Sequence, residues 1–325
     1  MSDSRPALIG DIGGTNARFA LTGADGDPMR VRTLATADYP GLAAAARAYL
    51  DLERPDPAPD RAAIAVASPV LGDRVSMTNR DWSFSISELR TTLGLAALRV
   101  VNDFTAQALA LPLLGDDETR RIGSGKAVPG APIAILGPGT GLGVSGVVEA
   151  PDGSRITLAT EGGHATIAPV GEREQAVVGE LARRFGHVSI ERAVSGPGLG
   201  NLAAAIANLD GLDHDAPEPS EITALALAGS DPVSIEALSL FCAMLGGAAG
   251  NLALTLGARG GVYIGGGIAR QIGDFLAASA FRARFEDKGR FRDYLSAIPS
   301  YVIMAENPAL RGLTALLQPD AGPGR

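Results

Sequence analysis

Two short glycine-rich stretches constrain the fold of this chain more than any other feature. GDIGGT (10–15) and GPGTGLG (137–143) each follow an apolar, strand-like run. Each also leads into a second strand-like run, RFAL (18–21) and VSGVV (144–148) respectively. A strand, a glycine turn and another strand, present twice, predict a duplicated α/β domain in which two hairpin loops face one cleft.

The rest of the chain alternates apolar strand-like runs with amphipathic helical patterns, which favours layered α/β architecture. The runs that predict buried strands are RAAIAVASPV (61–70), LRVVND (98–103), PIAILG (132–137), GVYIGG (261–266) and SYVIMA (300–305). Val178, Leu181, Ala182 and Phe185 share one face of a predicted helix, and Asn307-Pro308 is expected to open the last helix. DHDAPEPSE (213–221) is predicted to be a loop, and EDKGRFRDYL (286–295) a solvated helix face.

Composition narrows the class of protein. A length of 325 residues predicts roughly two domains. The net charge of -8 argues against nucleic acid as a partner. Cys242 is the only cysteine, which excludes an intrachain disulfide and any multi-cysteine metal site. A lone cysteine and the absence of a signal-peptide pattern in MSDSRPALIG favour the cytoplasm.

One segment could instead indicate a membrane protein. ALSLFCAMLGGAAGNLALTLGA (237–258) is uncharged and long enough to cross a bilayer. It is rich in Ala and Gly, however, and its larger apolar side chains fall on one helical stripe. We therefore expect a buried core helix, with no membrane partner.

The first glycine stretch admits several interpretations. A Walker A loop requires a lysine and a following helix, whereas Thr15-Asn16-Ala17-Arg18 follow here. A dinucleotide fingerprint also requires a helix, so the letter match of GLGVSG (141–146) is accidental. A tight turn could instead present backbone N–H groups and the Thr15 hydroxyl to phosphate oxygens. Asp11 would repel those phosphates unless Mg²⁺ lay between them. The alternative is a plain hairpin turn.

Polar side chains follow several of the predicted strands. Asn102-Asp103 ends one strand, where ligands collect in open α/β sheets and where a carboxylate could accept a proton from a hydroxyl. The alternative for Asp103 is a helix N-cap. EGGH (161–164) and Glu191 add donors and acceptors suited to sugar hydroxyls. GGVYIGGGIAR (260–270) leaves room for adenine or lets a helix N-terminus meet a phosphate; the alternative is close packing of a strand against a helix.

Six separated motifs, in this order and over nearly the whole chain, closely resemble the bacterial ATP-dependent glucokinases: GDIGGTNARFAL, NDFTAQALALP, GPGTGLGVSG, EGGHATIAP, ERAVSGPGLGNL and FEDKGRFRDYL. The resemblance implies an actin-like (ribonuclease-H-like) duplicated α/β domain with two lobes and a central cleft. It places residues 1–112 plus 306–325 in a small lobe and 113–305 in a large lobe. It implies Mg-ATP-dependent phosphorylation of the 6-hydroxyl of D-glucose, the first step of glycolysis, by a cytoplasmic homodimer.

The resemblance also implies a role for individual residues. The first phosphate loop would comprise Gly10, Asp11, Ile12, Gly13, Gly14 and Thr15, with Asp11 holding Mg²⁺ through water. The second phosphate loop would include Gly137, Gly139, Thr140 and Gly141, and the adenosine segment Gly265, Gly266 and Gly267. The sugar-contacting set would be Asn102, Asp103, Glu161, His164 and Glu191, with Asp103 as the general base.

Three alternatives remain open at this point. A kinase of broader hexose specificity would keep all of these motifs. A sugar-sensing regulator of the same fold would need a DNA-binding helix-turn-helix, for which fewer than about ten residues precede the first strand. An actin-like ATPase would keep the phosphate loops but has no need of NDF (102–104) or EGGH (161–164). The zinc-binding cysteine cluster of the related repressor–open-reading-frame–kinase family is absent from the sequence.

Overall fold

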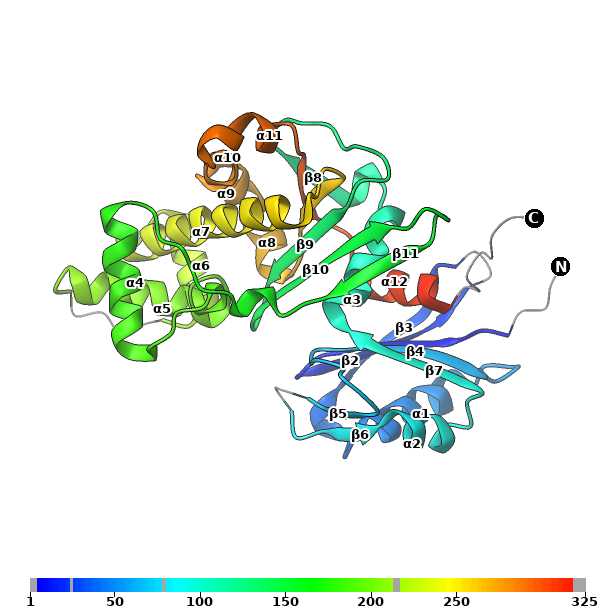
Figure 1. Cartoon of the computed structure of the whole chain (residues 1–325). Helices are drawn as coiled ribbons and strands as arrows, with labels where there is room; N and C mark the ends of the chain where they lie inside the picture. The colour runs from blue at the N-terminus through cyan, green and yellow to red at the C-terminus, as the bar shows by residue number, and fades with distance from the viewer. Residues whose placement is uncertain (1–4, 24–25, 78–79, 213–216, 318–325) are drawn as a thin grey trace. The chain divides into compact units, whose positions relative to one another are not determined.

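The computed structural model describes residues 5–23, 26–77, 80–212 and 217–317. The chain is α/β, as predicted, and clusters into two units (Figure 1). Unit 1 comprises Met1–Leu114, Ala150–Ala159 and Ala305–Arg325, and unit 2 comprises Gly115–Glu149 and Thr160–Met304. The division into two domains that the resemblance implies, residues 1–112 plus 306–325 and residues 113–305, stays a prediction.

Unit 1 contains a five-stranded sheet with the order β3-β2-β1-β4-β7. Its strands are β1 (Leu8–Ile12), β2 (Asn16–Thr22), β3 (Pro28–Ala35), β4 (Arg61–Val66) and β7 (Ala97–Asn102). β1 runs antiparallel to β2 but parallel to β4, and β4 runs parallel to β7. The carboxyl ends of β1, β4 and β7 therefore lie at the same edge of the sheet.

Alternation along these strands gives the sheet two buried faces. Leu8 and Ile12 belong to a core that includes α1 (Leu42–Glu53) and α2 (Ile86–Thr92). Ile9 belongs to the opposite core, which includes α3 (Asp103–Ala110) and α12 (Pro308–Leu317). The remaining elements of the unit are η1 (Thr36–Asp38), β5 (Arg74–Ser76), β6 (Ser83–Ser85), η2 (Leu111–Leu113) and β11 (Arg155–Ala159).

The sheet of unit 2 repeats this arrangement. It has six strands in the order β11-β10-β9-β12-β13-β8, and β11 (Arg155–Ala159) is the one that contact clustering assigns to unit 1. The others are β8 (Thr119–Ile122), β9 (Ile133–Pro138), β10 (Leu142–Glu149), β12 (Gly261–Ile264) and β13 (Ser300–Ile303). β10 runs antiparallel to β9, while β9, β12 and β13 are parallel neighbours in that order. The run β10-β9-β12-β13 thus matches β2-β1-β4-β7 in both order and direction. This match confirms the duplication predicted from the two glycine stretches.

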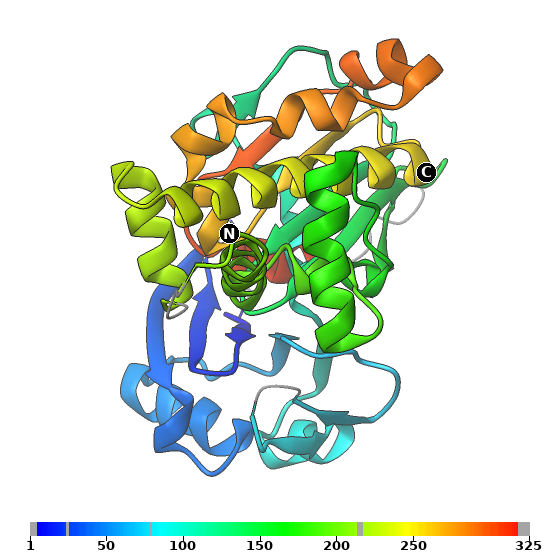
Figure 2. The same cartoon turned by 90° about the vertical axis from the view of Figure 1, so that its left-hand side faces the viewer.

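The helices of unit 2 pack against its sheet and against one another (Figure 2). They are α4 (Gly171–Phe185), α5 (Gly196–Leu209), α6 (Pro219–Ala228), α7 (Pro232–Leu256), α8 (Gly267–Gln271), α9 (Gly273–Ala278), α10 (Phe281–Glu286) and α11 (Arg292–Ser296). Short 3-10 turns are η3 (Asp116–Glu118), η4 (Gly162–His164), η5 (Ile190–Arg192) and η6 (Gly289–Phe291). Among the described residues, only α7 is long and apolar enough to cross a membrane, but 67% of its most apolar window is buried inside the protein. Its stripe packs into the main core of the unit, which confirms the predicted core helix.

Two local predictions were wrong. Pro219–Glu221, predicted as loop, form the first turn of α6, because proline fits the first helical position; residues 213–216 of that predicted loop lie outside the described residues. Residues 286–295 are not one helix face. Gly289 has φ 56°, so the chain turns through η6 between α10 and α11.

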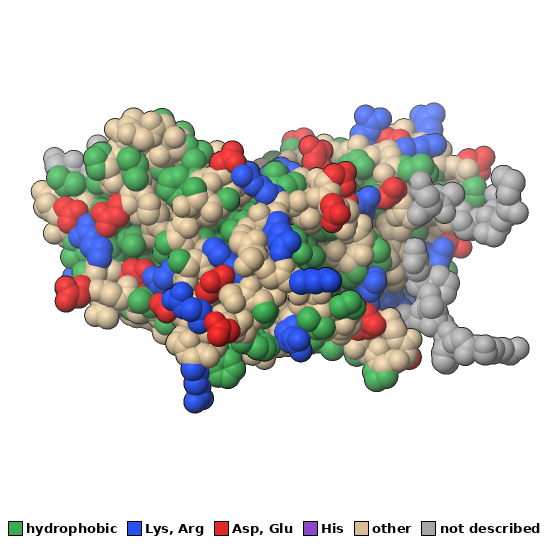
Figure 3. All heavy atoms as spheres, turned by 90° about the horizontal axis from the view of Figure 1, so that it is seen from above, with side chains coloured by type: hydrophobic (Ala, Val, Ile, Leu, Met, Phe, Trp, Pro, Cys, Tyr) green, Lys and Arg blue, Asp and Glu red, His purple; other side chains and the backbone are tan. Residues whose placement is uncertain are grey.

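The view in Figure 3 shows basic and acidic side chains interspersed over one face of the molecule.

Candidate functional site

The first glycine stretch forms the turn of the β1–β2 hairpin, as predicted. The Gly13 N–H donates to Asn16 O at 2.9 Å and closes the loop. Asp11 lies opposite Arg18 in the β1–β2 register, with Oδ2 3.7 Å from the guanidinium. Burial raises the pKa of the Asp11 carboxyl, and the Arg18 charge opposes that rise. The hairpin therefore carries a partly buried carboxylate directly before its glycine turn.

Gly10 lies inside β1 rather than in the turn. A Cβ at this position would lie 2.9 Å from both Ile64 Cδ1 and Phe19 Cδ1. The missing side chain therefore makes room for two large core residues. A contact between Gly10 and phosphate stays a prediction.

Asn102 and Asp103 lie where β7 ends and α3 begins. Asn102 is the N-cap of α3, since its Oδ1 accepts from Phe104 N–H at 2.9 Å. Its amide nitrogen donates to Ser68 O at 3.4 Å, just beyond β4. The cap predicted as an alternative for Asp103 thus falls one residue earlier. Asp103 is the first residue of the helix, and its Oδ1 accepts from Phe104 N–H at 2.9 Å.

The Asp103 carboxyl has an unusual pKa. Burial, followed by the negative charge of Asp11, raises its pKa to about 7. Asp11 and Asp103 therefore interact at the common edge formed by the ends of β1 and β7. This edge of unit 1 holds one carboxylate beside a glycine turn and another that exchanges its proton near neutral pH.

In unit 2, the second glycine stretch forms the β9–β10 hairpin, with Gly139, Thr140 and Gly141 as its loop. The Gly139 N–H donates to Gly141 O at 2.8 Å. The Gly139 carbonyl accepts from the Gly196 N–H of α5 at 2.7 Å. The loop is thus fixed both internally and by the start of a helix.

EGGH (161–164) packs against β10 directly after this loop. A Cβ on Gly163 would overlap Leu142 O, and one on Gly162 would lie 2.9 Å from Val144 Cγ1. The two glycines therefore let the segment lie flat on the strand. Glu161 and His164, on either side of them, are exposed and able to meet a ligand.

Glu191 lies in η5 and bonds to the same hairpin. Its Oε2 accepts from Leu142 N–H at 2.8 Å. A Cβ on Gly141 would overlap this carboxylate oxygen. The sequence predicted Glu191 only as a sugar contact, and its bond to the second loop spans 49 residues.

The third glycine segment closes the turn between β12 and α8. The Gly265 N–H donates to Leu136 O at 2.9 Å. Gly266 has φ 88°, and a Cβ there would overlap Pro138 O, so both conformation and space require glycine. Gly267 is the first residue of α8. The segment lies beside the end of β9, where the second hairpin begins.

One contact of the first hairpin has no signal in the sequence. Thr36, which is fully buried, donates from Oγ1 to Gly14 O at 2.7 Å across 22 residues. Neither LATADYP (34–40) nor its spacing from GDIGGT (10–15) predicts this bond.

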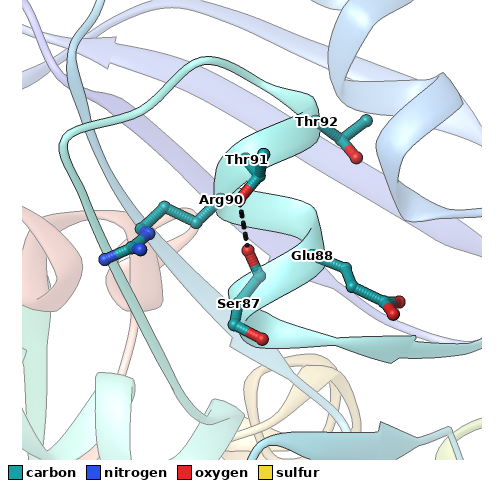
Figure 4. Close-up of a pocket in the computed structure, with 5 residues that line it drawn as sticks. All are labelled: Ser87, Glu88, Arg90, Thr91 and Thr92. Atoms are coloured by element: carbon teal, nitrogen blue, oxygen red, sulfur yellow. Dashed lines mark hydrogen bonds between the residues drawn. The ribbon is translucent and has the colours of Figure 1, made fainter.

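No cluster of three or more His, Cys, Asp or Glu side chains suited to a metal occurs within the described ranges. Asp11 alone still fits Mg²⁺, because this ion takes one or two carboxylates and completes its shell with water and phosphate oxygens. A shallow pocket along α2 lies apart from the candidate residues (Figure 4). Its lining is Ser87, Glu88, Arg90, Thr91 and Thr92.

Comparison with known proteins adds to this geometry. A family model described as Glucokinase matches residues 8–320. The chain belongs to the glucokinase family. This membership confirms the family predicted from the six motifs.

The chain is 56% identical over 317 residues to a glucokinase of Aromatoleum aromaticum, covering 97% of this chain and 96% of the relative. A crystal structure of glucokinase from an Antarctic psychrotroph has 37% identity and a TM-score of 0.87, covering 97% of this chain and 99% of that chain. A ROK family glucokinase from Streptomyces griseus in complex with glucose and AMPPNP has 21% identity and a TM-score of 0.64, covering 96% of this chain and 98% of that one. At 21% identity, the last likeness shows the fold alone.

Proposed function

We propose that this chain transfers the γ-phosphoryl group of ATP to the 6-hydroxyl of D-glucose. The observation that carries the proposal is the Asp103 carboxyl, whose pKa is raised to about 7 at the end of β7. A carboxyl that titrates near neutral pH is suited to general-base work. Membership of the glucokinase family supports both substrates, as does the 56% identity to a glucokinase of Aromatoleum aromaticum.

In this proposal, Asp103 accepts the proton of the 6-hydroxyl as its oxygen attacks the γ-phosphorus. Asn102, Glu161, His164 and Glu191 bind the other sugar hydroxyls and orient the ring. Positioning matters most, because phosphoryl transfer leaves little covalent chemistry to the protein. The hairpin N–H groups stabilise the negative charge that spreads over the transferring oxygens.

The two hairpins and the Gly265–Gly267 segment bind ATP in this proposal. The N–H groups of Gly14 and Thr15 face phosphate oxygens, as do those of Thr140 and Gly141, while the N–H groups of Gly13 and Gly139 close the two turns. Asp11 would hold Mg²⁺ through water, and the ion would supply positive charge that offsets the phosphates. The Gly267 N–H at the start of α8 faces the adenosine end.

The oligomer and the compartment are proposals as well. The family resemblance supports a homodimer, which sedimentation of the purified protein tests. Cys242 is free and buried, which fits a reducing cytoplasm.

The reaction is tested directly by incubating the purified protein with Mg-ATP and glucose and following glucose 6-phosphate. Asp103→Asn should lower kcat by at least about a hundredfold, because general-base catalysis contributes roughly 10²–10⁴-fold. Mg-AMPPNP affinity should stay nearly unchanged in the variant. Asp51→Asn, at an exposed carboxylate on α1, is the matched control and should keep wild-type turnover. Near-normal kcat in Asp103→Asn would reject the assigned base.

A further inference from the structure

We propose that Thr36 is a positioning residue that holds the first hairpin loop in the shape that receives the phosphates of ATP. The inference rests on the proposed function, since it assigns ATP to that loop. Thr36 lies outside every motif named above. It is the first residue of η1, directly after β3.

Thr36 bonds to two successive carbonyl groups of the loop. Its hydroxyl donates to Gly14 O at 2.7 Å, and its own N–H donates to Thr15 O at 2.9 Å. Thr36 is fully buried, which limits the competition from water at its hydroxyl and N–H. One side chain and its backbone thus fix both peptide groups that follow Gly14 and Thr15.

Fixing these carbonyls also sets the direction of the N–H groups. In a planar trans peptide, the C=O of one residue and the N–H of the next point in opposite directions. With the Gly14 carbonyl turned toward Thr36, the Thr15 N–H must point away from it. Within the part of the chain that the structure describes, the Thr15 N–H donates to no protein acceptor. It is therefore available to an anion.

Thr36 is itself held by two hydrogen bonds to its carbonyl group. Its carbonyl accepts from Arg80 Nη2 at 2.9 Å and from Tyr39 N–H at 3.3 Å. The Arg80 guanidinium lies 5.9 Å from the ring centroid of Trp82, which is part of the core of unit 1. The loop is therefore connected through Thr36 and Arg80 to the core of the unit.

The test compares Thr36→Val with Thr36→Ser. Valine keeps the branched shape but leaves Gly14 O without its donor, whereas serine keeps the hydroxyl. We expect Thr36→Val to raise the KM for ATP and the Kd of Mg-AMPPNP about three- to tenfold, the usual worth of one hydrogen bond. The KM for glucose at saturating ATP should change less than about twofold. Thr36→Ser should restore both nucleotide constants to within about twofold of wild type.

Unchanged nucleotide constants in a folded Thr36→Val protein would overturn the proposal, as would equal losses in both variants. If Thr36→Val fails to fold, Arg80→Met decides, because it removes the donor to Thr36 O and keeps an apolar stem. It should raise the AMPPNP Kd about two- to fivefold, and no change would overturn the proposal. AMPPNP binding is measured without sugar, so this result stands even if the wild-type protein makes no glucose 6-phosphate.

Discussion

At the scale of single residues, Asp103 combines two opposing demands. A base must be ionised to accept a proton, yet burial and the charge of Asp11 both favour its protonated form. The fraction of Asp103 able to act therefore grows as the pH rises through about 7. Arg18, 3.7 Å from Asp11, keeps positive charge beside this carboxylate pair.

The pH profile follows from this balance. We expect kcat/KM for glucose to rise with pH along a limb whose apparent pKa is about 7, the value for Asp103 in the free protein. Asp11→Asn removes a negative charge, so it should lower the pKa of Asp103 and move the limb to lower pH. The same variant should need more Mg²⁺ for half-maximal activity. Initial rates across pH and Mg²⁺ concentration measure both effects.

Asp51→Asn is again the control and should leave the limb in place. A limb that stays at the wild-type pH in Asp11→Asn would show that the two carboxylates do not interact. If Asp11→Asn needed no more Mg²⁺ than the wild-type protein, Asp11 would have no role in binding the ion.

At the scale of elements, η5 connects a predicted sugar contact to the second hairpin. The Glu191 carboxylate accepts from Leu142 N–H at 2.8 Å and lies against Gly141. The Glu191 carboxylate touches the loop proposed to bind phosphate and also belongs to the proposed sugar contacts. Its loss should therefore weaken the binding of both substrates.

We expect Glu191→Ala to raise the KM for glucose and the KM for ATP, each about three- to tenfold or more. Glucose loses a hydrogen-bond partner, and the second hairpin loses the carboxylate that accepts from Leu142 N–H. Glu191→Gln keeps an oxygen that can accept from Leu142 N–H, so its ATP constant should stay near wild type. Glu161→Ala serves as comparison, because Glu161 is exposed and its variant should affect glucose alone. If Glu191→Ala leaves the KM for ATP unchanged, the bond to the hairpin has no role in nucleotide binding. Steady-state kinetics with each substrate varied in turn measures these constants.

The elements themselves were largely predictable from the sequence. Apolar runs mark β1, β4, β7, β9, β12 and β13, and both hairpins follow from their glycine turns. What could not be predicted depends on distances across the fold. Thr36 meets Gly14 only because β3 lies beside β2, and Gly10 packs the core because Phe19 and Ile64 converge on it. A single sequence gives no signal for such contacts.

At the scale of the whole molecule, the proposed sugar contacts are divided between the two units. Asn102 and Asp103 belong to unit 1, whereas Glu161, His164 and Glu191 belong to unit 2. The proposed function assigns all five to one hexose. Under this proposal, D-glucose would close the units and exclude water that otherwise hydrolyses ATP.

Small-angle scattering measures this coupling. We expect saturating D-glucose to reduce the radius of gyration of the protein, because a bridging ligand favours the more closed arrangement. L-glucose at the same concentration is the control, since its hydroxyls do not match a site built for the D-enantiomer, and it should leave the profile unchanged. Calorimetry on the same samples establishes that D-glucose is bound. Identical profiles with and without bound D-glucose would show that the sugar does not close the two units.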